Sequence, residues 1–226
     1  MKPFLFNTDM VKAIKNRLKT FTRRCIKYRS SDGLKPVPSN AKFVGIKCGK
    51  FTWETEDSII SIKAPCQIGD ILYVRETWQK HRIKKPQKAV PDDFKEIQYS
   101  YKADGELANS DGSPFVWRPS IHMPKDAARI FLRVTHVRVE RLMDITQEDA
   151  LKEGGTGVPC DCSNIDEHGC VDCFNTGWIE PPTIEFMWLW DSTIKPADLP
   201  VYGWSANPWV WVIEFEKISK EEATKC

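Results

Sequence analysis

Short segments in which apolar and polar residues alternate dominate the pattern along this chain. Alternation with a period of two, or a short apolar run bounded by turn residues, predicts a β-strand. By these criteria we expect strands at residues 3–6, 21–26, 41–48, 51–54, 58–62, 71–78, 97–101, 128–142 and 208–218.

Apolar residues at helical spacing are fewer. They predict helices at residues 10–18, 147–153 and 183–194. Asn7 or Thr8 can cap the first helix, which should end near Lys19, and Thr146 can cap the second, which two glycines stop just after Glu153. Many short strands with few helices predict an α+β fold that is mainly β, either a barrel or a half-open sheet.

Length and composition are compatible with a single domain over residues 1–226. The chain is 41% hydrophobic, which is ample for a packed core. Residues 79–125 are polar and rich in proline, so we expect loops around the strand at 97–101, as an elaboration of the core domain.

Charge changes this picture only locally. The formal net charge is +2, so the total gives no argument for a polyanionic partner. Residues 11–30, however, contain eight basic residues and no acid, and residues 80–88 contain five more. A solvated basic surface and a phosphate-binding surface both explain these two runs.

The first residues lack the apolar core of a signal peptide, and no apolar run approaches the length that spans a membrane. We therefore expect a cytoplasmic protein with no membrane partner. In that reducing compartment the eight cysteines should not form disulfides, so clustered cysteines call for another explanation.

Four of the cysteines form two close pairs within residues 156–180. One residue separates Cys160 from Cys162, two separate Cys170 from Cys173, and seven lie between the pairs. Such spacing lets four thiolates reach one tetrahedral ion, so we expect a structural zinc site in an inserted loop. Free thiols, or His168 in place of one cysteine, are the alternatives.

Nine tryptophans suggest both core and ligand contacts. Those in periodic elements are expected in the core, and they are Trp188, Trp190, Trp209 and Trp211. Trp78 and Trp117 lie beside polar residues at a strand end and in a loop, where contact with a ligand competes with burial. The isolated His122 is expected to be structural.

Residues 19–24 gather ionisable and hydroxyl groups where the first helix should give way to a strand. The period of two places Thr22 and Arg24 on one face of that strand, and Lys19 lies at the junction that feeds it. A basic helix end followed by a half-exposed strand is the simpler interpretation.

Several of these segments resemble the ASCH family, which has a PUA-like β-barrel. They are LKTFTRR at 18–24, GDILYV at 69–74, DALKEG at 149–154 and WVWVIEF at 209–215. The whole chain resembles the larger ASCH proteins often carried by bacteriophages, and WRPSIHMP at 117–124 is similar to theirs. The resemblance implies a PUA-like barrel with a few peripheral helices, in the host cytoplasm if the protein is phage-encoded.

The resemblance also implies a ligand class. ASCH domains are generally thought to bind RNA or nucleotides, and a small bacterial member removes the acetyl group from N(4)-acetylcytidine. Its lysine, threonine and glutamate are similar to Lys19, Thr22 and Glu153 here. In an amidohydrolase Thr22 could be the nucleophile, Lys19 its base and Glu153 the proton donor, with Arg24 holding a substrate oxygen. The alternative is a binding module that grips RNA, a nucleotide or a modified base without turnover.

Overall fold

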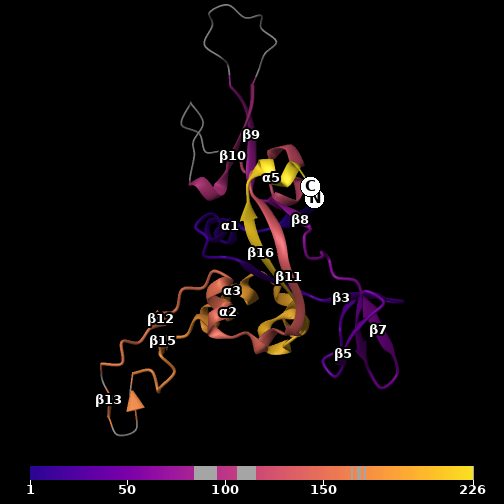
Figure 1. The fold of residues 1–226 in the computed structure, drawn as a ribbon, viewed down its shortest axis with the longest axis vertical. Coiled ribbons are helices and arrows are strands. Elements are labelled where there is room, and N and C mark those ends of the chain that lie inside the picture. Colours follow the sequence, from indigo (N-terminus) through magenta and orange to yellow (C-terminus); the bar gives the residue numbers. More distant parts are fainter. Residues whose placement is uncertain (84–95, 106–115, 164, 167–168, 171, 226) are drawn as a thin grey trace, which may run out of the picture. The chain divides into compact units, whose positions relative to one another are not determined.

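The computed structural model has a mixed α+β fold, mainly strands with few helices (Figure 1). It describes residues 1–83, 96–105, 116–163, 165–166, 169–170 and 172–225. These residues group into two compact units, and each is described by itself. The first consists of residues 1–17, 70–133 and 216–226, and the second of residues 18–69 and 134–215.

The first unit is built on three paired strands. β1 (Lys2–Leu5) runs parallel to β8 (Ile71–Arg75), and β8 is antiparallel to the first residues of β11 (Phe131–Arg141). β9 (Trp78–Ile83) and β10 (Glu96–Tyr101) form an antiparallel hairpin.

Short helices complete this unit, and they are α1 (Thr8–Lys15), α5 (Lys220–Thr224) and the 3-10 turns η1 (Lys102–Asp104), η2 (Ser120–His122) and η3 (Lys125–Ala127). α1 ends earlier than predicted, because Asn16 closes it and Arg17 takes a left-handed conformation with φ 60°. Asn7 is its N-cap, and its side chain accepts the Met10 N–H at 2.8 Å.

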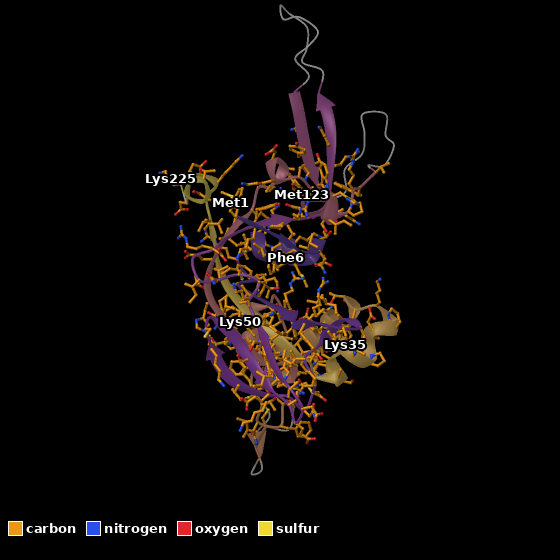
Figure 2. The ribbon with its side chains drawn as sticks, turned by 90° about the vertical axis from the view of Figure 1, so that its right-hand side faces the viewer. Met1, Phe6, Lys35, Lys50, Met123 and Lys225 are labelled. Carbon is orange, nitrogen blue, oxygen red and sulfur yellow. The ribbon has the colours of Figure 1, made fainter. Side chains whose placement is uncertain are left out.

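The core of the first unit joins apolar residues of the hairpin to the strands. Trp78, Tyr101, Met123 and Phe131 are all buried there, and Figure 2 labels Met123. A buried carboxylate, Glu76, accepts hydrogen bonds from Arg129 at 2.9 and 3.0 Å.

The second unit contains β2 (Phe21–Cys25), which is antiparallel to β16 (Trp209–Ile218), itself the neighbour of β11. The helices α2 (Gln147–Lys152) and α3 (Pro182–Ser192) pack on each other, and their apolar residues share a core with Phe21, Val210 and Val212. The remaining helices are α4 (Leu199–Tyr202) and the 3-10 turns η4 (Leu142–Asp144), η5 (Pro196–Asp198) and η6 (Trp204–Ala206).

A separate three-stranded antiparallel sheet belongs to the same unit. It contains β5 (Lys42–Lys47), β6 (Lys50–Glu54) and β7 (Ile59–Ile62), labelled in part in Figure 1. Trp53 is fully buried, and its ring lies 6.0 Å from that of Trp209 and 6.2 Å from that of Trp211. These contacts hold the sheet against β16.

Small hairpins account for the other strands. β3 (Lys27–Ser30) pairs with β4 (Gly33–Pro36), β12 (Val158–Pro159) with β15 (Trp178–Glu180), and β13 (Ile165–Asp166) with β14 (Gly169–Cys170). Sequence periodicity predicts none of the strands β3, β4 and β9.

Two expectations need correction. Within either unit the described strands form open sheets and hairpins, and they do not close into a barrel. Trp188, expected in the core, is 67% exposed, because α3 turns its Phe186 and Trp190 side inward. Trp190 and Trp211 are buried as predicted, and Trp209 is partly buried.

Candidate functional site

The backbone holds Lys19 beside Glu153, although the two are 134 positions apart in the sequence. The two residues form an isolated antiparallel bridge. The Thr20 N–H donates to the Lys152 carbonyl at 2.8 Å, and the Phe215 N–H donates to the Thr20 carbonyl at 2.9 Å. The end of α2 is thereby joined to the segment that leads into β2, and Lys19 and Glu153 are brought together as their common role in the ASCH resemblance implies.

Glu153 is the centre of a buried charged cluster. The Lys19 Nζ donates to the Glu153 carbonyl at 2.9 Å and makes a shorter contact with its Oε2, while the Arg23 Nη1 donates to Oε1 at 3.2 Å. Each of the three residues is less than 5% exposed. Both carboxylate oxygens therefore accept a hydrogen bond from a basic side chain in a buried site.

Arg23 extends this cluster to two further acids. Its Nη2 donates to the Asp149 Oδ2 at 2.7 Å, and its Nε donates to the Glu140 Oε1 at 3.0 Å. Arg138 donates to the same two acids at 2.9 and 3.2 Å. Arg23 was not among the residues predicted for the site, because a strand pattern gives the face of a residue and not the groups that cover it.

Burial lowers the pKa of Lys19 from its ordinary value of 10.5, and the nearby Arg24 and Arg23 lower it further. The attraction of the Glu153 carboxylate works in the opposite direction without cancelling the shift. The sequence placed Lys19 at a helix end, where its charged form would be favoured. A lysine at a helix end would stay charged and would be a poor base, but α1 ends at Lys15, so Lys19 is not at that helix end.

Thr22 and Arg24 share a face of β2, as the alternation predicts, but Arg23 lies on the other face. In the ladder Thr22 is opposite Ile213, and Arg24 is opposite Trp211. Within the described part of the chain, no hydrogen bond links the buried Thr22 hydroxyl to Lys19 or Glu153. The pleat thus places Thr22 on the face of β2 opposite Arg23, which binds Glu153. This arrangement does not favour a threonine activated by Lys19.

A cavity of about 430 Å³ lies beside this cluster. β2 contributes Arg23, Arg24 and Cys25 to its wall, and the opposite wall comes from the segment between α3 and α4. The complete lining is Arg23, Arg24, Cys25, Lys27, Trp190, Thr193, Ile194, Lys195, Asp198 and Tyr202. Four of these residues are basic and one is acidic. Arg23 is already paired with Glu153, Glu140 and Asp149, so the positive charge that favours an anionic ligand comes from Arg24, Lys27 and Lys195.

The remaining walls of the cavity are aromatic and apolar. The Lys27 ammonium lies 4.2 Å from the centre of the Tyr202 ring, and the Trp190 Nε1 donates to the Tyr202 carbonyl at 2.9 Å. Burial raises the pKa of the Cys25 thiol to about 11, so that residue contributes a neutral group. The cavity therefore combines cations with flat apolar surfaces.

The two tryptophans proposed as ligand contacts both belong to the first unit. Trp78 is 4% exposed, and its ring packs against Tyr99 and Arg118. Its burial leaves no face for stacking on a ligand. Trp117 is partly buried, and its role as a ligand contact stays a prediction.

The basic run at residues 11–30 is not a single solvated surface. Lys19 and Arg23 are buried, and Lys15 makes an ion pair with Asp104. The exposed cations of the run that belong to the second unit are Lys27 and Arg29. Most of the second run, at residues 84–88, lies outside the described residues.

Cys160, Cys162, Cys170 and Cys173 meet as predicted, with all four sulfur atoms within 4.8 Å of one another. The Cys160 and Cys170 sulfurs are 3.6 Å apart, and the Cys162 and Cys173 sulfurs are 3.8 Å apart. Ligands at about 2.3 Å from a tetrahedral zinc ion are separated by about 3.8 Å. The cluster therefore has the dimensions of a four-sulfur metal site.

The backbone of this loop is shaped around the four thiols. Cys162 and Asn175 adopt left-handed conformations, and the Asn175 Oδ1 accepts the Cys170 N–H at 2.9 Å. A Cβ at Gly169 would lie 2.2 Å from the Asn175 amide, so only glycine fits there. His168, the alternative ligand, lies outside the described residues.

No known family model matches the chain, and neither a curated protein nor a solved structure matches it. The resemblance to the ASCH family therefore rests on the sequence motifs. Among the described helices, none has the length and apolar character needed to cross a membrane.

Proposed function

We propose that this chain is an ASCH-type protein that binds a nucleotide, either free or within RNA, in the cavity between β2 and the α3–α4 segment. The observation that carries the proposal is the lining of this cavity, in which Arg24, Lys27 and Lys195 outnumber the one acid, Asp198, beside Tyr202 and Trp190. Its volume of about 430 Å³ is within the usual range for small-molecule sites. Phosphate is suited to the cations, and a base is suited to the aromatic walls.

The buried cluster next to the cavity supports this assignment. Arg23 is common to both, because its guanidinium binds Glu153 while the residue also lines the cavity. The contacts with Asp149, Glu140 and Glu153 fix the orientation of this arginine before any ligand arrives. Because these carboxylates already compensate the charge of Arg23, the cluster supports the site by fixing one wall of the cavity, and Arg24, Lys27 and Lys195 supply the charge for a phosphate.

Replacing Lys195 by glutamate should weaken the binding of uridine monophosphate about tenfold, since it changes a cation of the cavity into an anion. Titration calorimetry on the full chain measures the affinity. Lys42→Glu is the matched control, because Lys42 is an exposed lysine of the same unit that does not line the cavity. Equal affinities for the two variants, or no binding by the unmodified protein, would refute the proposal.

A second candidate is amide hydrolysis at the exocyclic amine of an N(4)-acylated cytidine. The lowered pKa of the buried Lys19, together with its contact to Glu153, favours it. A neutral Lys19 would take the proton of the attacking hydroxyl group as its oxygen bonds to the acyl carbon, and the leaving amine would receive that proton from the Lys19–Glu153 pair as the C–N bond breaks. Attack by water releases the carboxylic acid directly, whereas attack by Thr22 forms an ester that a water molecule then hydrolyses.

Mass spectrometry of acylated nucleosides incubated with the protein tests this second candidate. We expect deacylated product from the unmodified chain if turnover occurs. Thr22→Val then distinguishes two nucleophiles, because product persists when water attacks and disappears when the threonine hydroxyl attacks. A complete absence of product across the panel rejects the hydrolase.

A further inference from the structure

A second hollow of about 720 Å³ lies in the same unit, between β3 and β7. We call it the β3–β7 groove. Its lining consists of Lys27, Tyr28, Arg29, Lys50 and the six residues Ser58, Ile59, Ile60, Ser61, Ile62 and Lys63. Four of these residues are basic and none is acidic.

The four cations of the groove are available to a ligand. Lys27, Arg29, Lys50 and Lys63 are all exposed, and Figure 2 labels Lys50. Within the described residues, no carboxylate lies within ion-pair distance of any of them. Elsewhere on the same sheet Lys47 does have such a partner, Glu54 at 3.6 Å. A row of cations without ion-pair partners favours binding of a partner with several negative charges.

The rest of the groove suits flat apolar groups. Ile59 is 68% exposed, and Tyr28 is partly buried at the side of the groove. Lys27 and Arg29 are on the same face of β3, where alternate residues are about 6.6 Å apart. Phosphates held by such a row of cations would place their bases over the isoleucines and Tyr28.

Lys27 lines both the groove and the cavity that contains Arg23 and Arg24. A ligand with one nucleotide in the cavity can therefore continue past Lys27 into the groove. We infer that the ligand of this protein is a single-stranded polynucleotide, with one nucleotide in the cavity and the phosphates of its neighbours along the β3–β7 groove. The inference rests on the proposed function for the location of that one nucleotide.

The test compares a labelled single-stranded oligouridylate with uridine monophosphate, by fluorescence anisotropy and competition on the full chain. We expect the oligomer to bind more tightly than the mononucleotide. Four contacts predict that the logarithm of the oligomer's association constant falls with the logarithm of salt concentration with a slope of about −2.8.

Lys50→Glu combined with Lys63→Glu isolates the groove, because neither residue lines the cavity. This double variant should bind the oligomer about tenfold or more weakly and lower the magnitude of the salt slope by about 1.4, while the affinity for the mononucleotide is unchanged. Lys42→Glu is the control, since Lys42 is exposed on the same sheet and outside the groove.

Three results would overturn the inference. The first is an oligomer that binds no more tightly than the mononucleotide, and the second is a double variant with unchanged affinity for the oligomer. The third is displacement of the oligomer by polyglutamate at equal charge, which would assign the groove to an acidic protein segment. Failure of the proposed function has a different signature. In that case the mononucleotide does not bind, whereas oligomer binding still depends on Lys50 and Lys63.

Discussion

Glu153→Gln is expected to reduce the free energy of unfolding by about 3 kcal/mol, because it removes the carboxylate that compensates two buried cations. Lys19 would retain the Glu153 carbonyl as an acceptor but lose its anionic partner. Arg23 would retain Asp149 and Glu140. Most of the loss should therefore come from Lys19, and urea denaturation of the full chain measures it.

Two further variants separate this effect from a general loss of charge. Glu148→Gln, on the helix α2 that Glu153 follows, breaks an exposed pair with Lys152 and should cost no more than about 0.5 kcal/mol. Adding Lys19→Met to Glu153→Gln removes the uncompensated cation and should recover part of the stability. A Glu153→Gln protein as stable as the Glu148→Gln protein would contradict the buried cluster.

The pH dependence of the Glu153→Gln variant has a definite sign. Burial already lowers the pKa of Lys19 below 10.5, and removing Glu153 removes the attraction that opposes this shift. Between the lowered pKa and 10.5 the unfolded chain binds more protons than the folded chain, so stability rises with pH in that window. The window starts at a lower pH in the variant, so its deficit in stability should shrink as the pH rises from the variant's Lys19 pKa to that of the unmodified protein, and should then stay constant.

The sequence predicted the meeting of Lys19 and Glu153 only through the resemblance to the ASCH family. Periodicity identifies the strand that follows Lys19 and the helix that precedes Glu153, but no local pattern pairs them across 134 residues. Arg23 shows that a local pattern also fails to identify the distant partners of a single residue. Alternation assigned it to the face opposite Thr22, and its three acidic partners come from β11, α2 and the residue after α2.

The fold shows the same division between local and distant information. Asn7 and Thr146 cap their helices as predicted, because capping depends on neighbouring residues alone. Trp188 was assigned to the core because it lies in a periodic element, and only the packing of Phe186 and Trp190 decides which side of α3 faces inward. β3 and β4 were not predicted because each has four residues and a single large apolar side chain, Tyr28 or Leu34, which is too few to give a periodic pattern.

Protein purified without added metal should contain about one equivalent of zinc, and Cys170→Ser should contain almost none. Four cysteine sulfurs within 4.8 Å of one another supply a complete tetrahedral set, so loss of one ligand opens the site. Cys48→Ser is the matched control, because Cys48 is an exposed cysteine outside the cluster and should leave the zinc content unchanged. Elemental analysis measures all three proteins.

Removal of the metal by a chelator should make residues 158–180 accessible to protease while the rest of the second unit resists cleavage. The loop's strands have only two or three residues each, and Ile165 and Phe174 are 66% and 82% exposed, so apolar burial contributes little to its order. Metal binding must supply the free energy that a core supplies elsewhere, and for structural zinc sites it is on the order of 10 kcal/mol. Because Trp53, Trp209 and Trp211 pack independently of the four cysteines, the tryptophan environment of that aromatic core should be unchanged by the chelator. A cleavage pattern that is the same with and without the chelator would show that the four thiols order the loop without a metal.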